Sequence, residues 1–165
     1  MIIGCSFERK ALDEPVSALD VSVRSQVLNL LLDLQDERGL TYLIIAHDLA
    51  ILRHVTTYLV IMYLGRIVEQ GPTEELLGAP QRPYTRALVA ASPRLERHES
   101  RVMVALDSDV ISATSNGCAF APRCPHAMNR CNEEIPRLRA EGQRISATHL
   151  AACHALETFS SLPAE

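Results

Sequence analysis

Two acidic residues stand side by side near the start of this sequence, in the decapeptide ALDEPVSALD at 11–20. Asp13 and Glu14 come directly before a proline, and Asp20 ends the stretch. Adjacent carboxylates can divide the work of one site, because one holds a divalent cation through oxygen while the other accepts a proton. A solvated acidic turn is the alternative, since proline, serine and aspartate all favour turns and helix caps.

His47 follows the continuous apolar run LTYLIIA at 40–46, which begins after Gly39. Such a run predicts a strand that is buried on both faces of a parallel sheet. Ligands of α/β proteins gather beyond the C-terminal ends of such strands. Glu14 and His47 would both stand beyond such strand ends, and a histidine that only satisfies local hydrogen bonds fits this position as well as one near a ligand.

Four of the five cysteines lie in the last third of the chain, separated by five, six and twenty-one residues: Cys118, Cys124, Cys131 and Cys153. Disulfides are disfavoured in a reducing cytosol, and ordinary thiols seldom gather in a polar, proline-rich segment. A zinc site could recruit His126, His149 or His154, but the usual C-x₂₋₄-C pair is missing. An iron–sulfur cluster tolerates the wider spacing, and Pro125 after Cys124 is a known accompaniment. Cys5 is given no role.

Regular elements must position these residues. Helical spacing of Val23, Val27, Leu30, Leu31 and Leu34 predicts a helix near 21–38, with Asp20 as N-cap and Gly39 as the stop. A short helix is expected at 48–55, then two strands at 58–63 and 66–71 joined by a tight Leu64–Gly65 turn. Further helices are expected from a Thr73 cap and from Pro83 to Ala91. The alternation predicts an α/β layer architecture.

Composition narrows the class of protein. With 165 residues and 47% hydrophobic content, the chain can bury a core. A formal net charge of −4 argues against a general nucleic-acid binder, so no nucleic-acid partner is expected. The most apolar run, at 57–65, is far shorter than the roughly 20 residues of a membrane-spanning helix. The first residues lack the features of a secretion signal, and we expect a cytoplasmic protein.

Three stretches together resemble the C-terminal half of the nucleotide-binding domains of ATP-binding-cassette (ABC) transporters: LDEPVSALD, LIIAHD and VIMYLGRIVEQGPTEELL. A fourth, PQRPYTRALVAASP, is similar to the oligopeptide/dipeptide importer subgroup, and the resemblance runs from about Leu12 to the end. It implies part of a P-loop NTPase-type domain, a parallel sheet with helices, at 12–92. An atypical segment at 1–11, a linker with a short strand at 93–116 and a cysteine-containing extension at 117–165 would complete the chain.

The resemblance also implies roles. Asp13 would hold Mg²⁺ through water, Glu14 would activate the water that attacks ATP, and His47 would sense the γ-phosphate. Ser17 and Asp20 would contact a second ABC ATPase subunit, while transmembrane permease subunits would hold the assembly at the inner face of the cell membrane. The four cysteines of the extension would bind a [4Fe–4S] cluster.

Departures from the family pattern are equally specific. No stretch reads G-x-x-x-x-G-K-[ST], and the Q-loop and the Ser-Gly-Gly signature are absent. The charged run FERKAL precedes Asp13, so we expect the first ten residues not to form the usual buried strand. We therefore expect a C-terminal portion of a longer subunit, unable to hydrolyse ATP alone and prone to self-association through its apolar strands. The alternative is a non-catalytic remnant that binds a metal or a cluster.

Overall fold

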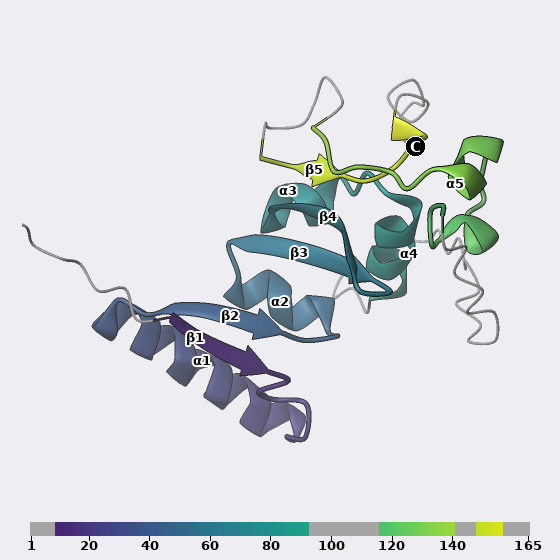
Figure 1. Cartoon of the computed structure of the whole chain (residues 1–165). Helices are drawn as coiled ribbons and strands as arrows, with labels where there is room; N and C mark the ends of the chain where they lie inside the picture. Colours follow the sequence, from purple (N-terminus) through teal and green to yellow (C-terminus); the bar gives the residue numbers. More distant parts are fainter. Residues whose placement is uncertain (1–8, 93–115, 141–147, 157–165) are drawn as a thin grey trace, which may run out of the picture. The chain divides into compact units, whose positions relative to one another are not determined.

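The computed structural model describes residues 9–92, 116–140 and 148–156, drawn in colour in Figure 1. Strands and helices are mixed along the chain, which agrees with the predicted α/β class. The chain divides into two compact units between Val55 and Thr56.

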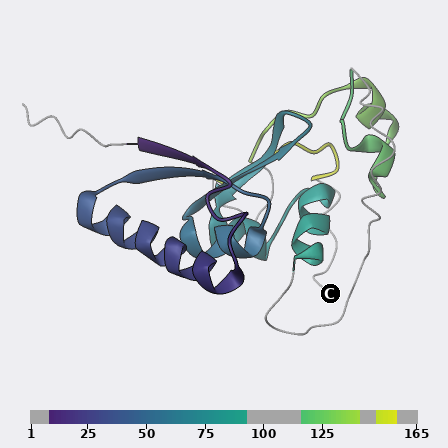
Figure 2. The same cartoon turned by 90° about the horizontal axis from the view of Figure 1, so that it is seen from below.

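Unit 1 is a βαβ arrangement. Strand β1 (Arg9–Asp13) pairs in parallel with β2 (Thr41–Ile45), and Asp13 lies opposite Ile45 in the register. Helix α1 (Val21–Arg38) connects the two strands and runs alongside them (Figure 2), and the short helix α2 (Leu49–Val55) follows β2. Because the strands are parallel, the residues after Asp13 and Ile45 emerge at the same edge of the sheet.

Helix α1 has the predicted bounds. Gly39 ends it in the left-handed conformation, with φ of 62°, and its N–H donates to the carbonyl of Gln35. Glycine adopts this conformation without a steric penalty, which explains the sharp stop. Asp20 occupies the N-cap position with extended backbone, but its side chain makes no capping hydrogen bond. The predicted cap is therefore right in position and wrong in its hydrogen bond.

Strand β1 begins at Arg9, within the ten residues that we expected not to form the usual buried strand; Arg9 and Lys10 are exposed, so their charges are not desolvated there. The expectation for strand β2 is wrong. Strand β2 is not buried on both faces, because Leu43 is 64% exposed and Ile45 is 53% exposed. Among the described residues, only β1 pairs with β2, and the face that carries Leu43 and Ile45 stays accessible.

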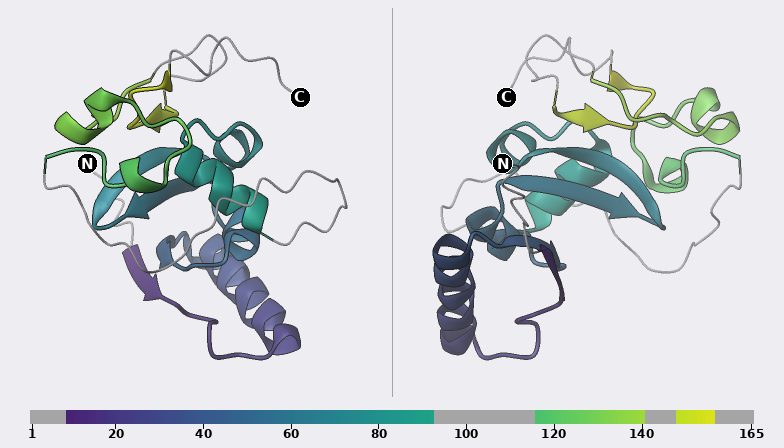
Figure 3. Two further views of the ribbon diagram at one scale, coloured as in Figure 1. Left: turned by 90° about the vertical axis from the view of Figure 1, so that its right-hand side faces the viewer. Right: turned by 60° about the vertical axis from the view of Figure 1, so that its left-hand side comes forward.

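Unit 2 is built on an antiparallel hairpin of β3 (Tyr58–Tyr63) and β4 (Arg66–Pro72), with β5 (Leu150–Ala151) along the free edge of β4. Figure 3 shows the hairpin as a long twisted ribbon. Its turn places Leu64 at φ 45° and Gly65 at φ 75°, and two positive φ angles match the right-handed twist of the strands. The predicted pair of strands and its tight turn are confirmed.

Helices α3 (Thr73–Gly78) and α4 (Pro83–Ala91) follow the hairpin, and α4 has the predicted bounds with proline in its first turn. Thr73 is the first residue of α3, and Pro72 takes the cap position that we assigned to Thr73. The Thr73 hydroxyl instead lies 3.1 Å from the hydroxyl of Thr56.

The core of unit 2 joins the hairpin, α4 and the cysteine-containing part of the chain. The rings of Tyr63, Tyr84 and Phe120 form one cluster, with centroids 4.6 to 5.6 Å apart. Phe120 precedes a short 3₁₀ helix, η1 (Ala121–Arg123), and α5 (Asn129–Glu133) follows it. Phe120 is almost fully buried, so this part of the extension packs as an integral part of unit 2.

Residues 93–115 of the predicted linker region lie outside the described residues, and so does the short strand predicted at 102–111. No helix in the described ranges has both the length and the apolar character needed to cross a membrane.

Candidate functional site

Glu14 and His47 meet at the edge of the sheet in unit 1. The N–H of Glu14 donates to the carbonyl of Ile45 at 2.9 Å, which extends the parallel pairing by one step. Nδ1 of His47 lies 2.8 Å from Oε1 of Glu14 and donates to it, since a carboxylate can only accept. The structure thus brings together the two side chains that the sequence predicted at this edge.

The electrostatics of the pair favour a charged imidazole. The hydrogen bond that His47 donates to Glu14 raises the pKa of His47 above its ordinary value of 6.5, and the charge of the same carboxylate adds to the effect. Both side chains are accessible, at 77% for His47 and 39% for Glu14. Solvent therefore screens the ion pair, and its geometry matters more here than its contribution to stability.

The backbone of Glu14 is strained. Its φ of 48° lies in the left-handed region, which costs a residue with a side chain about 1–2 kcal/mol. The turn that follows holds this conformation: the Ser17 hydroxyl donates to the Glu14 carbonyl at 3.1 Å, and Val16 is buried. Strain of this kind is retained where the direction of a side chain matters.

Other predicted residues surround the pair. Asp13, Ser17 and Asp20 are all exposed. The Asp13 side chain makes no hydrogen bond or ion pair with the residues that the structure describes, so its oxygens are free toward that part of the chain. Asp13 ends β1, and Ser17 and Asp20 lie between β1 and α1; of the three, only Ser17 has a hydrogen bond to Glu14 in the described part of the chain.

A pocket adjoins the pair, lined by the β1–α1 turn, α1, the end of β2 and the start of α2. Two of its lining residues form an ion pair: Nη1 of Arg24 lies 3.7 Å from Oδ2 of Asp48, while Oδ1 of Asp48 accepts from the N–H of Ala50 and caps α2. Sequence reasoning missed Arg24. Its place in the first turns of the helix after the carboxylates was the available signal.

The four cysteines gather in unit 2. The N–H of Cys118 donates to the carbonyl of Cys131 at 2.7 Å, and the N–H of Cys124 donates to Ala121 on η1. Burial raises the pKa of the Cys124 thiol, and the thiols of Cys153, Cys118 and Cys131 raise it further. Burial likewise raises the pKa of Cys153. All four are free thiols that lie within electrostatic range of their neighbours.

These thiols do not form a finished metal site. Within 9–92, 116–140 and 148–156, no group of three His, Cys, Asp or Glu side chains is arranged to hold a metal ion. Two histidines predicted as substitute ligands are engaged elsewhere: Nε2 of His149 lies 2.8 Å from Oε1 of Glu69, and Nε2 of His154 lies 3.0 Å from the carbonyl of Glu134. His126 is exposed.

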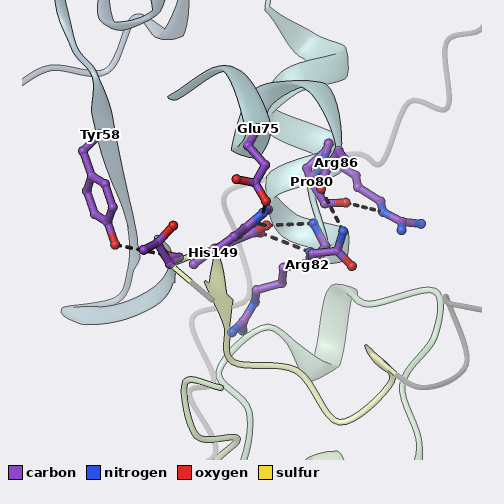
Figure 4. Close-up of polar contacts among 10 residues, drawn as sticks. Tyr58, Glu75, Pro80, Arg82, Arg86 and His149 are labelled. Atoms are coloured by element: carbon purple, nitrogen blue, oxygen red, sulfur yellow. Dashed lines mark hydrogen bonds and ion pairs between the residues drawn. The ribbon is translucent and has the colours of Figure 1, made fainter. Parts of the chain in front are cut away.

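Arg82 reaches the thiols from the start of α4, and sequence reasoning missed it. Its guanidinium donates to Sγ of Cys118 at 3.2 Å and to the carbonyl of Ala152 at 2.6 Å. Figure 4 shows Arg82 beside the contacts of His149. Its place directly before Pro83, the first residue of the helix, was the only sequence signal for a fixed position.

Comparison with known proteins gives the same family as the sequence motifs. Residues 68–131 match the family described as oligopeptide/dipeptide transporter, C-terminal region. The dipeptide transport ATP-binding protein DppF of Haemophilus influenzae is 48% identical over 142 residues, which cover 84% of this chain and 43% of that protein. A probable peptide ABC transporter ATP-binding protein of Sinorhizobium fredii is 50% identical over 146 residues, covering 86% and 40%.

The DppF protein of Escherichia coli is 44% identical over 147 residues, covering 88% of this chain and 42% of that protein. The chain thus spans less than half the length of these relatives. Identity at this level across most of the chain, together with the matched C-terminal region, shows that the chain belongs to the family of ATP-binding proteins of peptide ABC transporters.

Proposed function

We propose that unit 1 carries the hydrolytic part of an ATP site in the ATP-binding subunit of a peptide importer. The contact between Glu14 and His47, at the ends of two adjacent parallel strands, carries this proposal. Both side chains reach solvent at the edge where α/β proteins bind ligands. The strained backbone of Glu14 supports the same role, because the chain holds this carboxylate in a costly direction.

Glu14 acts as the base or orienting group for the attacking water. His47 binds one of its carboxylate oxygens, so the other can accept a proton. The hydrogen bond also fixes the imidazole ring, whose Nε2 is left to donate to a phosphate oxygen of ATP. A charged imidazole suits that task, and the raised pKa of His47 favours the charged form.

Asp13 would hold Mg²⁺ through water, and its exposed carboxylate has the hard oxygen donors that this ion prefers. When bound, the ion neutralises charge on the phosphate oxygens. Ser17 and Asp20, exposed on the β1–α1 turn, contact a second ABC ATPase subunit. The Asp20 carboxylate is not spent on capping α1, which leaves it for this contact.

The whole assembly includes transmembrane permease subunits, with this subunit peripheral at the inner face of the cell membrane. The printed sequence holds no phosphate-binding G-x-x-x-x-G-K-[ST] loop. By itself, the chain therefore hydrolyses ATP no faster than its Glu14→Gln variant. In this proposal, a partial ATPase domain covers 12–92, a linker region covers 93–116 and an extension covers 117–165.

A chimera tests the catalytic roles. Residues 12–165 replace the matching segment of the Haemophilus influenzae relative, which supplies the remaining part of the protein. Glu14→Gln should lower ATP turnover by about 100-fold or more, as expected for loss of a general base. Glu37→Gln, an exposed acid on α1, is the matched control. Equal turnover in the Glu14→Gln and Glu37→Gln chimeras would overturn the proposal.

A second proposal concerns unit 2: Cys118, Cys124, Cys131 and Cys153 bind a [4Fe–4S] cluster, with zinc as the alternative. Their donor chemistry fits either group, because four free thiols share one neighbourhood and a buried guanidinium faces one of them. The side chains are not yet arranged as a ligand set, so binding has to draw them together. The bound group would cross-link the segments that carry them.

Anaerobic reconstitution of the full chain with iron and sulfide tests the second proposal. Bound iron and sulfide, with broad visible absorption, are expected in the wild type and should be lost when any of the four cysteines is changed to serine. Cys5→Ser is the control and should keep the signal. Stoichiometric zinc without iron identifies the alternative, and a chain that holds neither metal overturns the site.

A further inference from the structure

Arg82 is a buried cation without a carboxylate partner in the described part of the chain. Its residue is 3% exposed, and its guanidinium donates to one carbonyl and one sulfur. No Asp or Glu oxygen in the described residues lies within ion-pair distance of it. Because a buried charge is costly unless an opposite charge compensates it, we expect Arg82 to face a group that carries negative charge in the working protein.

Glu69 is a buried acid that contacts Arg82, but it accepts from the backbone N–H of Arg82 and, within the described part of the chain, makes no hydrogen bond or ion pair with the guanidinium. Oε1 accepts from the N–H of Gln81 at 2.7 Å and lies 2.8 Å from Nε2 of His149, and Oε2 accepts from the backbone N–H of Arg82 at 3.1 Å. Glu69 therefore holds the backbone of Arg82, while the guanidinium donates to other groups.

Those other groups belong to two of the cysteine-bearing segments. One is the sulfur of Cys118, and the second is the carbonyl of Ala152, in the peptide that joins Ala152 to Cys153. Both ends of this contact are pinned by backbone hydrogen bonds, from Cys118 to Cys131 and from Ala152 to Val68. The Arg82 side chain thus links the segment that carries Cys118 to the segment that carries Cys153, at a fixed position.

We propose that Arg82 is the charge partner of the four-thiol site, donating a hydrogen bond to the Cys118 sulfur and compensating the negative charge that the metal-bound thiolates carry. This inference rests on the thiol site proposed above. It holds for either occupant, because four thiolates leave a net negative charge around zinc and around a [4Fe–4S] cluster alike. Hydrogen bonds of this kind tune the affinity and the reduction potential of metal sites.

The test compares Arg82→Lys with Arg82→Gln in the full chain. Both replacements keep a polar head for the Ala152 carbonyl, but only lysine keeps the charge. Arg86→Gln is the matched control, because Arg86 lies on the helix that Arg82 precedes and is exposed. Thermal melts of the metal-free proteins check folding. Loss of metal to a chelator and the midpoint potential of the reconstituted cluster are then measured.

Arg82→Gln should weaken metal retention by about 10–100-fold, the usual effect of removing an outer partner of a metal site, and should lower the midpoint potential. Arg82→Lys should lie between Arg82→Gln and the wild type, and Arg86→Gln should match the wild type. Equal metal retention and equal midpoint potential in Arg82→Lys and Arg82→Gln would overturn the role of Arg82 but leave the thiol site standing. A wild type that holds neither iron nor zinc overturns the thiol site and this role together.

Discussion

The two candidate sites are built in opposite ways. In unit 1, the charged pair of Glu14 and His47 is open to solvent, and the buried apolar side chains of the described part of that unit are Val16 and Leu52. In unit 2, Arg82, Glu69 and His149 are almost or fully buried, and Phe120 is buried against two tyrosine rings.

This difference decides what holds the polar groups of each site in place. Exposed charges are screened, so a carboxylate–histidine pair in water binds weakly until another surface excludes the solvent. Buried polar groups must instead be satisfied within their own unit, as the three contacts of the Glu69 carboxylate illustrate. In the proposed function, unit 1 presents exposed groups to a ligand and a partner, whereas unit 2 already holds the Glu69 carboxylate in place.

The largest expected effect is on the core of unit 2. Phe120→Ala removes a side chain that is 1% exposed and contacts Tyr63 and Tyr84, so it should lower the free energy of unfolding by about 3–5 kcal/mol. Leu43→Ala, at 64% exposure in unit 1, should change it by less than about 0.5 kcal/mol. Urea unfolding followed by circular dichroism measures both. Similar losses in the two variants would contradict the contrast between the units.

A smaller effect is expected where β4 meets the segment that carries His149. A Cβ at Gly71 would lie 3.1 Å from the Cα and Cγ of His149, so Gly71→Ala should cost about 1–3 kcal/mol through overpacking. Gly78 has no neighbour within 4 Å of such a Cβ, and Gly78→Ala serves as the control. Thermal melts compare them. Equal melting temperatures would show that residues 148–156 are not closely packed on β4.

Much of the fold could be predicted because local signals agreed. The bounds of α1 follow from its helical spacing, Asp20 and Gly39, and those of α4 from Pro83. Strand burial could not be predicted in this way, because it depends on which elements cover a face. Leu43 and Ile45 read as core residues in sequence, yet they are exposed in the structure.

For the candidate sites too, contacts that follow from local signals could be predicted and contacts that depend on distant residues could not. The contact between Glu14 and His47 follows from parallel pairing, since two residues beyond parallel strand ends meet at one edge. Arg82 could not be predicted, because arginine is usually exposed and nothing in its spacing indicates burial. Its position depends on Glu69 and on residues far along the chain, and such long-range contacts leave no periodic pattern in the sequence.

The exposed face of β2 gives a prediction with little effect on folding. Leu43→Lys and Ile45→Lys should change the melting temperature little, because both side chains are accessible, but they should reduce self-association of the chain. Sedimentation velocity at several protein concentrations measures the association. Val60→Lys, at 46% exposure on β3, is the comparison in unit 2. A wild-type chain that stays monomeric at all concentrations would contradict the expectation.

The smallest expected effect is the titration of His47, which tests whether the pair in unit 1 exists in solution. The hydrogen bond and the charge of Glu14 raise the pKa of His47, so its NMR titration midpoint should lie above 6.5 and return toward that value in Glu14→Gln. A raised pKa means that the pair stabilises the fold at low pH, below the unfolded pKa, and that this stabilisation is lost as pH rises through the folded pKa. The gain in stability should be small because both side chains are exposed. A midpoint that is identical in the wild type and in Glu14→Gln would show that His47 and Glu14 do not stay paired. The proposed catalytic role of unit 1 would then lose the contact that carries it.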